Sequence, residues 1–155
     1  MKRYCIAILL VVAGYSAQAE TIRGPLDITR SADQVTAQIA QVRRDMADGK
    51  TYSEISADKR ADVDAALGRI SGRLVRADGA VLSPHDQMET LNDQELVNTT
   101  LAKAREDSRL VCRRERVVGS NMVTSQCMTV AQRRQRQQDS QQNISTMQRT
   151  GKQMD

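Results

Sequence analysis

The sequence has almost no aromatic side chains. It contains no Phe or Trp and three Tyr, of which only Tyr52 lies beyond the first nineteen residues. Each packed layer must therefore be built from aliphatic side chains, which contribute roughly 1.5–3 kcal/mol each when fully buried. The shortage also disfavours nucleic acid as a partner, because single-stranded nucleic acid is usually bound by aromatic rings that stack on its bases.

Histidine is equally scarce. His85 is the single histidine, and no G-x-S-x-G element accompanies it. Neither a histidine-based metal cluster nor a serine–histidine triad can be assembled from such an inventory. We therefore expect no metal, no cofactor, no catalytic residue and no enzymatic activity, with a hydrolase that uses carboxylates alone as an open alternative.

Only the amino-terminal end carries a long apolar run. The basic pair Lys2-Arg3 precedes an apolar segment over residues 5–13, and residues 17–19 form an A-x-A cleavage site. This pattern is typical of a secretory signal peptide. The apolar segment is shorter than the roughly 20 residues of a transmembrane helix. We expect cleavage after Ala19, a periplasmic or secreted product, and no transmembrane segment after cleavage.

Cysteine is sparse as well. Of the three cysteines, cleavage would remove Cys5 and leave Cys112 and Cys127, an even number in an oxidising compartment. These two stand symmetrically about Gly119-Ser120, and glycine tolerates the positive φ of a tight connection. Opposed Cα atoms in an antiparallel pair lie about 4.5–5.5 Å apart, a spacing that a disulfide spans. We predict a β-hairpin over residues 109–128 closed by this disulfide, with a redox-active, exchanging pair as the alternative.

The same symmetry sets the register of the other strand residues. It places Arg114 opposite Ser125 and Arg116 opposite Val123 on the cystine face. On the other face it pairs residues Val111 with Met128, Arg113 with Gln126, Glu115 with Thr124 and Val117 with Met122.

Apolar spacing predicts three amphipathic helices before the hairpin. The first starts at the cap Ser31, the second after Ser53 or Ser56, and the third at Ser83-Pro84, where proline takes the first helical position. The first two helices carry matching stripes: Val35, Ile39, Val42 and Met46, then Val63, Leu67, Ile70 and Leu74. Neither helix can bury its stripe alone, so the two should pack as an antiparallel pair.

The third helix has apolar residues on two faces. Met88 and Leu91 lie on one face, whereas Val97, Leu101 and Ala104 lie roughly opposite. We expect this helix to contact two neighbours. Its polar run over residues 92–95 is interpreted as a solvated turn, with a buried polar pair or binding site formed by Asn92 and Glu95 as the alternative.

A fourth helical segment follows the hairpin. Thr129 and Gln132 have capping-box spacing. The tail over residues 132–155 is rich in Gln and Arg and almost without apolar residues before Ile144 and Met147. A helix that is polar all round is seldom stable alone, so we expect the first two turns to be helical and the remainder to fray or to become ordered only against a partner.

These features predict a mostly α protein. It should be a small bundle of about three amphipathic helices with one disulfide-closed β-hairpin and a polar, partly helical or disordered tail. The expected organisation is a signal peptide over residues 1–19, an extended leader over 20–30, a single helical domain over 31–131 and the basic tail over 132–155.

The hairpin motif also carries a resemblance. The pattern C-R-R-E-x-x-x-G-S-x-x-x-x-x-x-C-x-T runs from Cys112 to Thr129. It resembles a set of small exported proteins of Gram-negative bacteria without an established activity, some of which have a tryptophan shortly after the second cysteine. Gln132, Arg133 and Arg134 stand there in this chain. The resemblance implies the disulfide and an exported location, and it implies no catalytic residue.

Charge is divided unevenly along the chain. Residues 20–102 hold 10 basic and 14 acidic side chains, whereas residues 103–155 hold 11 basic and 5 acidic ones. Guanidinium groups suit phosphates and carboxylates, and the candidate anion- or partner-binding residues are Arg113, Arg114, Arg116, Arg133, Arg134 and Arg136. The alternative is intramolecular pairing with the acidic helix faces, namely Asp45, Asp48, Asp58, Asp62 and Asp64.

The expected function is therefore that of an exported interaction or structural protein of the cell envelope. Its basic half would contact an anionic envelope component or another envelope protein. A small periplasmic enzyme or a redox-responsive protein with an unrecognised site is the alternative.

Overall fold

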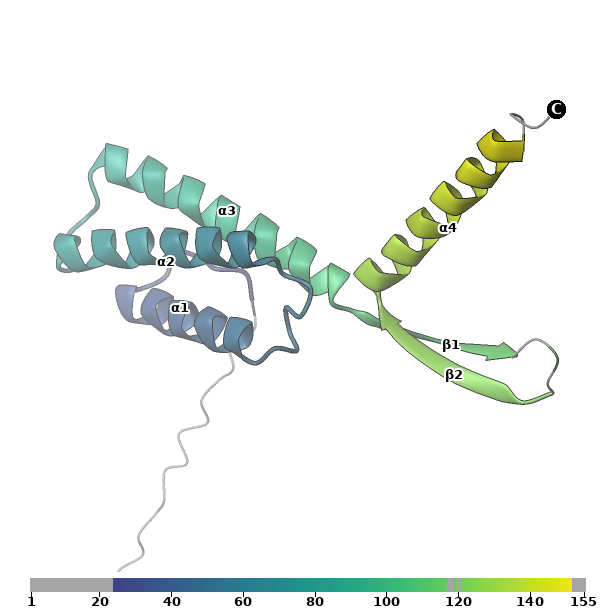
Figure 1. Ribbon diagram of the computed structural model, residues 1–155. Helices are drawn as coiled ribbons and strands as arrows, with labels where there is room; N and C mark the ends of the chain where they lie inside the picture. Colours follow the sequence, from purple (N-terminus) through teal and green to yellow (C-terminus); the bar gives the residue numbers. More distant parts are fainter. Residues whose placement is uncertain (1–23, 117–118, 120, 152–155) are drawn as a thin grey trace, which may run out of the picture.

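The computed structural model describes residues 24–116, 119 and 121–151. They form four helices and a two-stranded antiparallel hairpin (Figure 1). The elements are α1 Ala32–Ala47, α2 Ala57–Ala77, α3 Pro84–Asp107, β1 Leu110–Arg116, β2 Val123–Thr129 and α4 Val130–Gly151. The predicted class, mostly α with one hairpin, is confirmed. The predicted signal peptide and the pairing of Val117 with Met122 lie outside the described residues.

The hydrophobic core lies where the first three helices pack together, with α2 in contact with both α1 and α3. Both predicted stripes point into this core, although Leu74 at the end of the second stripe is only partly buried. The face of α3 that carries Val97 and Leu101 completes it, and the buried ring of Tyr52 comes from the α1–α2 connection. This three-helix body holds every buried aliphatic side chain among the described residues except Leu26 of the leader.

Serine caps start all three helices of the body. Ser31 forms the predicted capping box with Gln34, and Ser83 accepts a hydrogen bond from the backbone N–H of Asp86. Of the two serines left open for α2, Ser56 is the cap, and it accepts from the backbone N–H of Lys59. Each cap satisfies an N–H group that the helix itself cannot pair.

The described part of the leader, residues 24–30, is bound to the body by side-chain amides. Asn98 accepts from the Leu26 N–H at 2.8 Å and donates back to the Leu26 carbonyl at 2.9 Å. Gln94 accepts from the Ile28 N–H at 2.8 Å, and Gln38 of α1 accepts from the Asp27 N–H at 3.2 Å. The amides pair the leader backbone as a neighbouring strand would, and Leu26 is buried in the core.

The prediction that α3 contacts two neighbours is confirmed, since α3 contacts both α2 and α4, but the face of α3 that carries Met88 and Leu91 is largely exposed. Met88 and Leu91 are 61% and 45% exposed, whereas the opposite face of α3 is buried in the body. The aliphatic core is filled from one side of α3 only, because α1 and α2 both lie on that side.

Helix α4 is longer than the sequence predicts. It continues to Gly151 instead of ending after two turns. A side-chain pair four residues apart supports it, since Gln135 donates to Asp139 at 2.9 Å. Beyond its first turns the helix is solvent-exposed and projects from the body (Figure 1). None of the described helices combines the length and the apolar character needed to cross a membrane.

Candidate functional site

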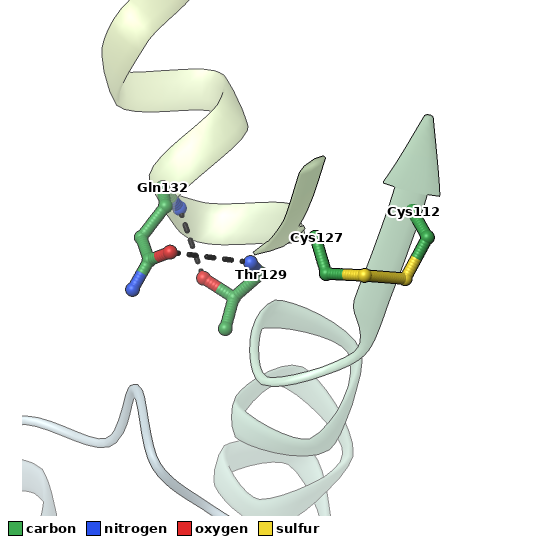
Figure 2. Close-up of a disulfide and its surroundings, with 4 residues drawn as sticks. All are labelled: Cys112, Cys127, Thr129 and Gln132. Atoms are coloured by element: carbon green, nitrogen blue, oxygen red, sulfur yellow. Dashed lines mark hydrogen bonds between the residues drawn. A yellow bond between two sulfur atoms is a disulfide. The ribbon is translucent and has the colours of Figure 1, made fainter. Parts of the chain in front are cut away.

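The hairpin forms in the predicted register. Cys112 pairs with Cys127, and the described partners match the expected ones from Val111 opposite Met128 to Arg116 opposite Val123; the strands also pair Leu110 with Thr129. The two cysteines form the predicted disulfide, with their Cα atoms 4.0 Å apart (Figure 2). The prediction of a disulfide-closed hairpin is confirmed.

The disulfide lies on an element with little other support. Both cysteines are exposed, and the hairpin extends from the body next to α4 (Figure 1). An isolated two-stranded hairpin is at best marginally stable in water. The cross-link, which spans 15 residues of sequence, is therefore the main source of order in the hairpin.

We expect loss of the disulfide to unfold the hairpin locally. In the chain-entropy model a bridge of this span contributes about 3 kcal/mol. In the double variant Cys112→Ser, Cys127→Ser, backbone amides of β1 and β2 should exchange with solvent much faster, while those of α1 to α3 stay protected. Hydrogen–deuterium exchange resolved by peptide segment measures the exchange of the strands and the protection of the helices. Unchanged exchange in the strands would contradict the prediction.

A polar junction fixes the hairpin and α4 to the body. The Thr129 hydroxyl donates to Glu54 at 2.8 Å, and Gln132 donates to the same carboxylate oxygen at 3.3 Å. Thr129 and Gln132 also form the predicted capping box at the start of α4 (Figure 2). The Glu54 N–H in turn donates to the hydroxyl of Ser108 at the end of α3. The end of β2 and the start of α4 are thus both held against the body.

The six candidate arginines fall into three groups. Arg134 pairs with Asp107 of α3 at 3.0 Å and belongs to the junction. Arg114 and Arg116 lie on the cystine face of β1, as the register dictates. The remaining three line a groove between the other face of the hairpin and the start of α4: Arg113, Arg133 and Arg136. The structure therefore brings together half of the predicted set.

The acidic helix faces do not pair with these arginines in the part of the chain that the structure describes. Asp64 pairs with Arg43 at 2.9 Å and Asp62 with Lys59 at 3.3 Å. Asp48 accepts from the backbone N–H groups of residues 50 and 51, and Asp45 accepts from Gln41. The alternative of intramolecular pairing with these carboxylates is wrong for the described residues, because most of them are satisfied by near neighbours.

The buried polar site of α3 differs from the expected one. Asn92 and Glu95 are exposed, so the alternative of a buried pair is wrong. Asp93 is buried instead and accepts from Arg69 and, at 2.7 Å, from Arg73 of α2. Burial would raise the pKa of Asp93, but the hydrogen bonds from the two guanidinium groups outweigh it and lower that pKa. This cluster joins α2 to α3 and is structural.

Other places in the molecule offer weaker chemistry. A cavity of about 370 Å³ lies between the start of α2 and the end of α3, and its two acidic and two basic side chains balance in charge: Glu54, Asp107, Lys59 and Lys103. His85 is exposed in the first turn of α3. Among the described residues no cluster of three or more His, Cys, Asp or Glu side chains could hold a metal ion. The groove of guanidinium groups is thus the strongest candidate site.

Comparisons with known proteins add no relative. No family model, no curated protein and no solved structure matches the chain.

Proposed function

We propose that this protein is an exported component of the cell envelope that binds an anionic partner through its hairpin and the start of α4. The observation that carries the proposal is a set of five arginines without a charged partner among the described residues: Arg113, Arg114, Arg116, Arg133 and Arg136. They lie on elements that project from the body (Figure 1). Uncompensated positive charge on a projecting surface steers anionic partners toward it.

Export is part of the same proposal. The signal-peptide pattern at the amino terminus supports it, as does the disulfide, because disulfides persist in oxidising compartments. The resemblance to small exported proteins of Gram-negative bacteria points the same way.

An anionic envelope component is the partner that this surface suits best. Guanidinium forks recognise phosphate and carboxylate groups, and such interactions weaken as salt screens them over about 8–10 Å. Nucleic acid is a poorer fit, since the described chain has one aromatic side chain and its ring is buried in the core.

We expect the wild-type protein to bind anionic vesicles or an envelope protein at low salt and to release them at high salt. Replacing the five arginines by glutamine should abolish this binding. Arg134 is left intact because its pair with Asp107 holds α4. Co-sedimentation with anionic and neutral vesicles, and pull-downs from envelope extract, measure the effect.

A charge-retaining control separates electrostatics from damage to the fold. The corresponding five-fold Arg→Lys variant should keep most of the binding, because long-range attraction depends on charge. Salt-independent binding, or equal binding by the glutamine variant, would refute the proposal.

A further inference from the structure

The groove beside the non-cystine face of the hairpin has opposed walls that carry charge. Arg113 and Glu115 reach it from β1, and Arg133 and Arg136 reach it from the first two turns of α4. Its floor includes the half-buried cross-strand pair of Val111 and Met128. The enclosed volume is about 190 Å³, room for one small ionic group and the first atoms of whatever carries it.

Both walls are fixed before any ligand arrives. The disulfide lies next to Arg113 in sequence and holds β1 to β2 in a single register. On the other side, the capping box of Thr129 and the pair of Arg134 with Asp107 set the direction in which α4 leaves the junction. The backbone on both sides of the groove is therefore in place before a ligand binds, which lowers the entropic cost of binding.

The charge in the groove is uncompensated. The lining contains three arginines and one carboxylate, that of Glu115. None of these four residues makes an ion pair with a described residue. The formal balance is two positive charges. A phosphate monoester carries about −1.5 to −2 charge at neutral pH and three acceptor oxygens, whereas a single carboxylate or a phosphate diester carries only one negative charge.

We propose that this groove binds the phosphate group of a monoester, with Arg113, Arg133 and Arg136 as its ligands. Gln126, which also lines the groove, supplies a neutral amide donor. The inference rests on the proposed function and narrows it from a general basic surface to one site. The monoester belongs either to a soluble metabolite or to a lipid head group, and the phosphate chemistry is shared by both.

Two triple variants with equal loss of charge test the site. The groove variant is Arg113→Gln, Arg133→Gln, Arg136→Gln. The control variant is Lys50→Gln, Arg76→Gln, Arg149→Gln, which removes three exposed basic side chains that lie outside the groove and outside the five-arginine surface. Far-ultraviolet circular dichroism and a thiol assay should show that both variants keep their helices and the disulfide.

The probes are glycerol 3-phosphate, measured by titration calorimetry, and phosphatidylcholine vesicles that contain phosphatidic acid, measured by co-sedimentation. Vesicles with phosphatidylglycerol, a diester, serve as the comparison. We expect the groove variant to bind the monoester at least tenfold more weakly than the wild type, because charged hydrogen bonds are lost. The control variant should stay within about twofold. Binding of glycerol 3-phosphate would support a soluble metabolite as the ligand. Binding of the phosphatidic acid vesicles without binding of glycerol 3-phosphate would support a lipid head group.

The inference is overturned if the wild type binds neither monoester, if it prefers the diester, or if both triple variants lose binding equally. If both triple variants lose binding equally, while the wild type still shows salt-dependent binding that the five-arginine variant lacks, the proposed function stands and only the groove site is refuted. Absence of any salt-dependent binding would remove both.

Discussion

Replacing Asp93 by asparagine should lower the free energy of unfolding by roughly 3 kcal/mol, as expected when one partner of a buried charge cluster is removed. Arg73 is only 9% exposed and would keep its charge without its closest partner. Glu89 and Asp86 lie farther from it, at 3.6 and 3.9 Å, and would compensate in part. Urea denaturation followed by circular dichroism measures the loss.

The effect of Asp93 should also depend on pH. Its pKa in the folded protein lies below the ordinary value of 3.8, so the unfolded chain binds the proton more readily. The stabilisation is therefore complete above about pH 5 and is lost as the pH falls through the lowered folded-state pKa. The wild type should lose more stability than Asp93→Asn between about pH 5 and pH 2.

A matched variant is Asp64→Asn, which breaks an ion pair between α1 and α2 whose side chains are about half exposed. Exposed pairs contribute about 0–1 kcal/mol, so this change should be small. Equal effects of the two substitutions would show that the Asp93 cluster is not special.

Replacing Leu67 by alanine should destabilise the protein by about 3 kcal/mol. Leu67 is completely buried between the helices, and the change combines a lost transfer free energy with a cavity. With so few large side chains in the core, neighbours have little volume with which to close that cavity. Thermal and urea unfolding both report the change.

The control is Leu91→Ala, the same substitution at a side chain that is 45% exposed on α3. Leu91→Ala should lower the free energy of unfolding by well under half as much as Leu67→Ala, because the substitution removes little buried apolar area. A similar loss in both variants would mean that Leu91 is covered in solution, for example by a second copy of the chain.

The hairpin could be predicted in detail because its signal is local. Two cysteines placed evenly about a glycine-containing centre determine the register, and each further pair follows by counting. The stripes of α1 and α2 were accessible for the same reason, since four apolar positions at helical spacing fix a single face.

The buried acid of α3 was missed although a signal for it existed. Thr90 and Asp93 precede Val97 by seven and four residues, which places all three on one helical face. Asn92 is rotated by about one hundred degrees from that face. The composition of residues 92–95 is typical of a solvated surface. The helical spacing from Val97 and Leu101, however, determines which of these four residues lies on the buried face.

The grouping of the arginines could not be predicted. The sequence shows that the six candidate arginines lie in the hairpin and directly after it, and the register assigns Arg113 and Arg114 to opposite faces. Which face α4 covers depends on the junction, where Thr129 meets Glu54 across 75 positions of sequence. No local pattern specifies a contact between residues so far apart.

The docked leader has a consequence for the order of folding. Leu26 is among the first described residues to be made, yet its backbone is held by Asn98, 72 positions later. The bundle of α1 and α2 can begin to form from nearby contacts, but until α3 exists the leader can bond only to Gln38 of α1 and lacks the amides of Gln94 and Asn98. Closing such a long loop is slow compared with forming neighbouring helices. The leader, although it is synthesised before the three helices, should therefore be among the last segments of the body to reach its native place.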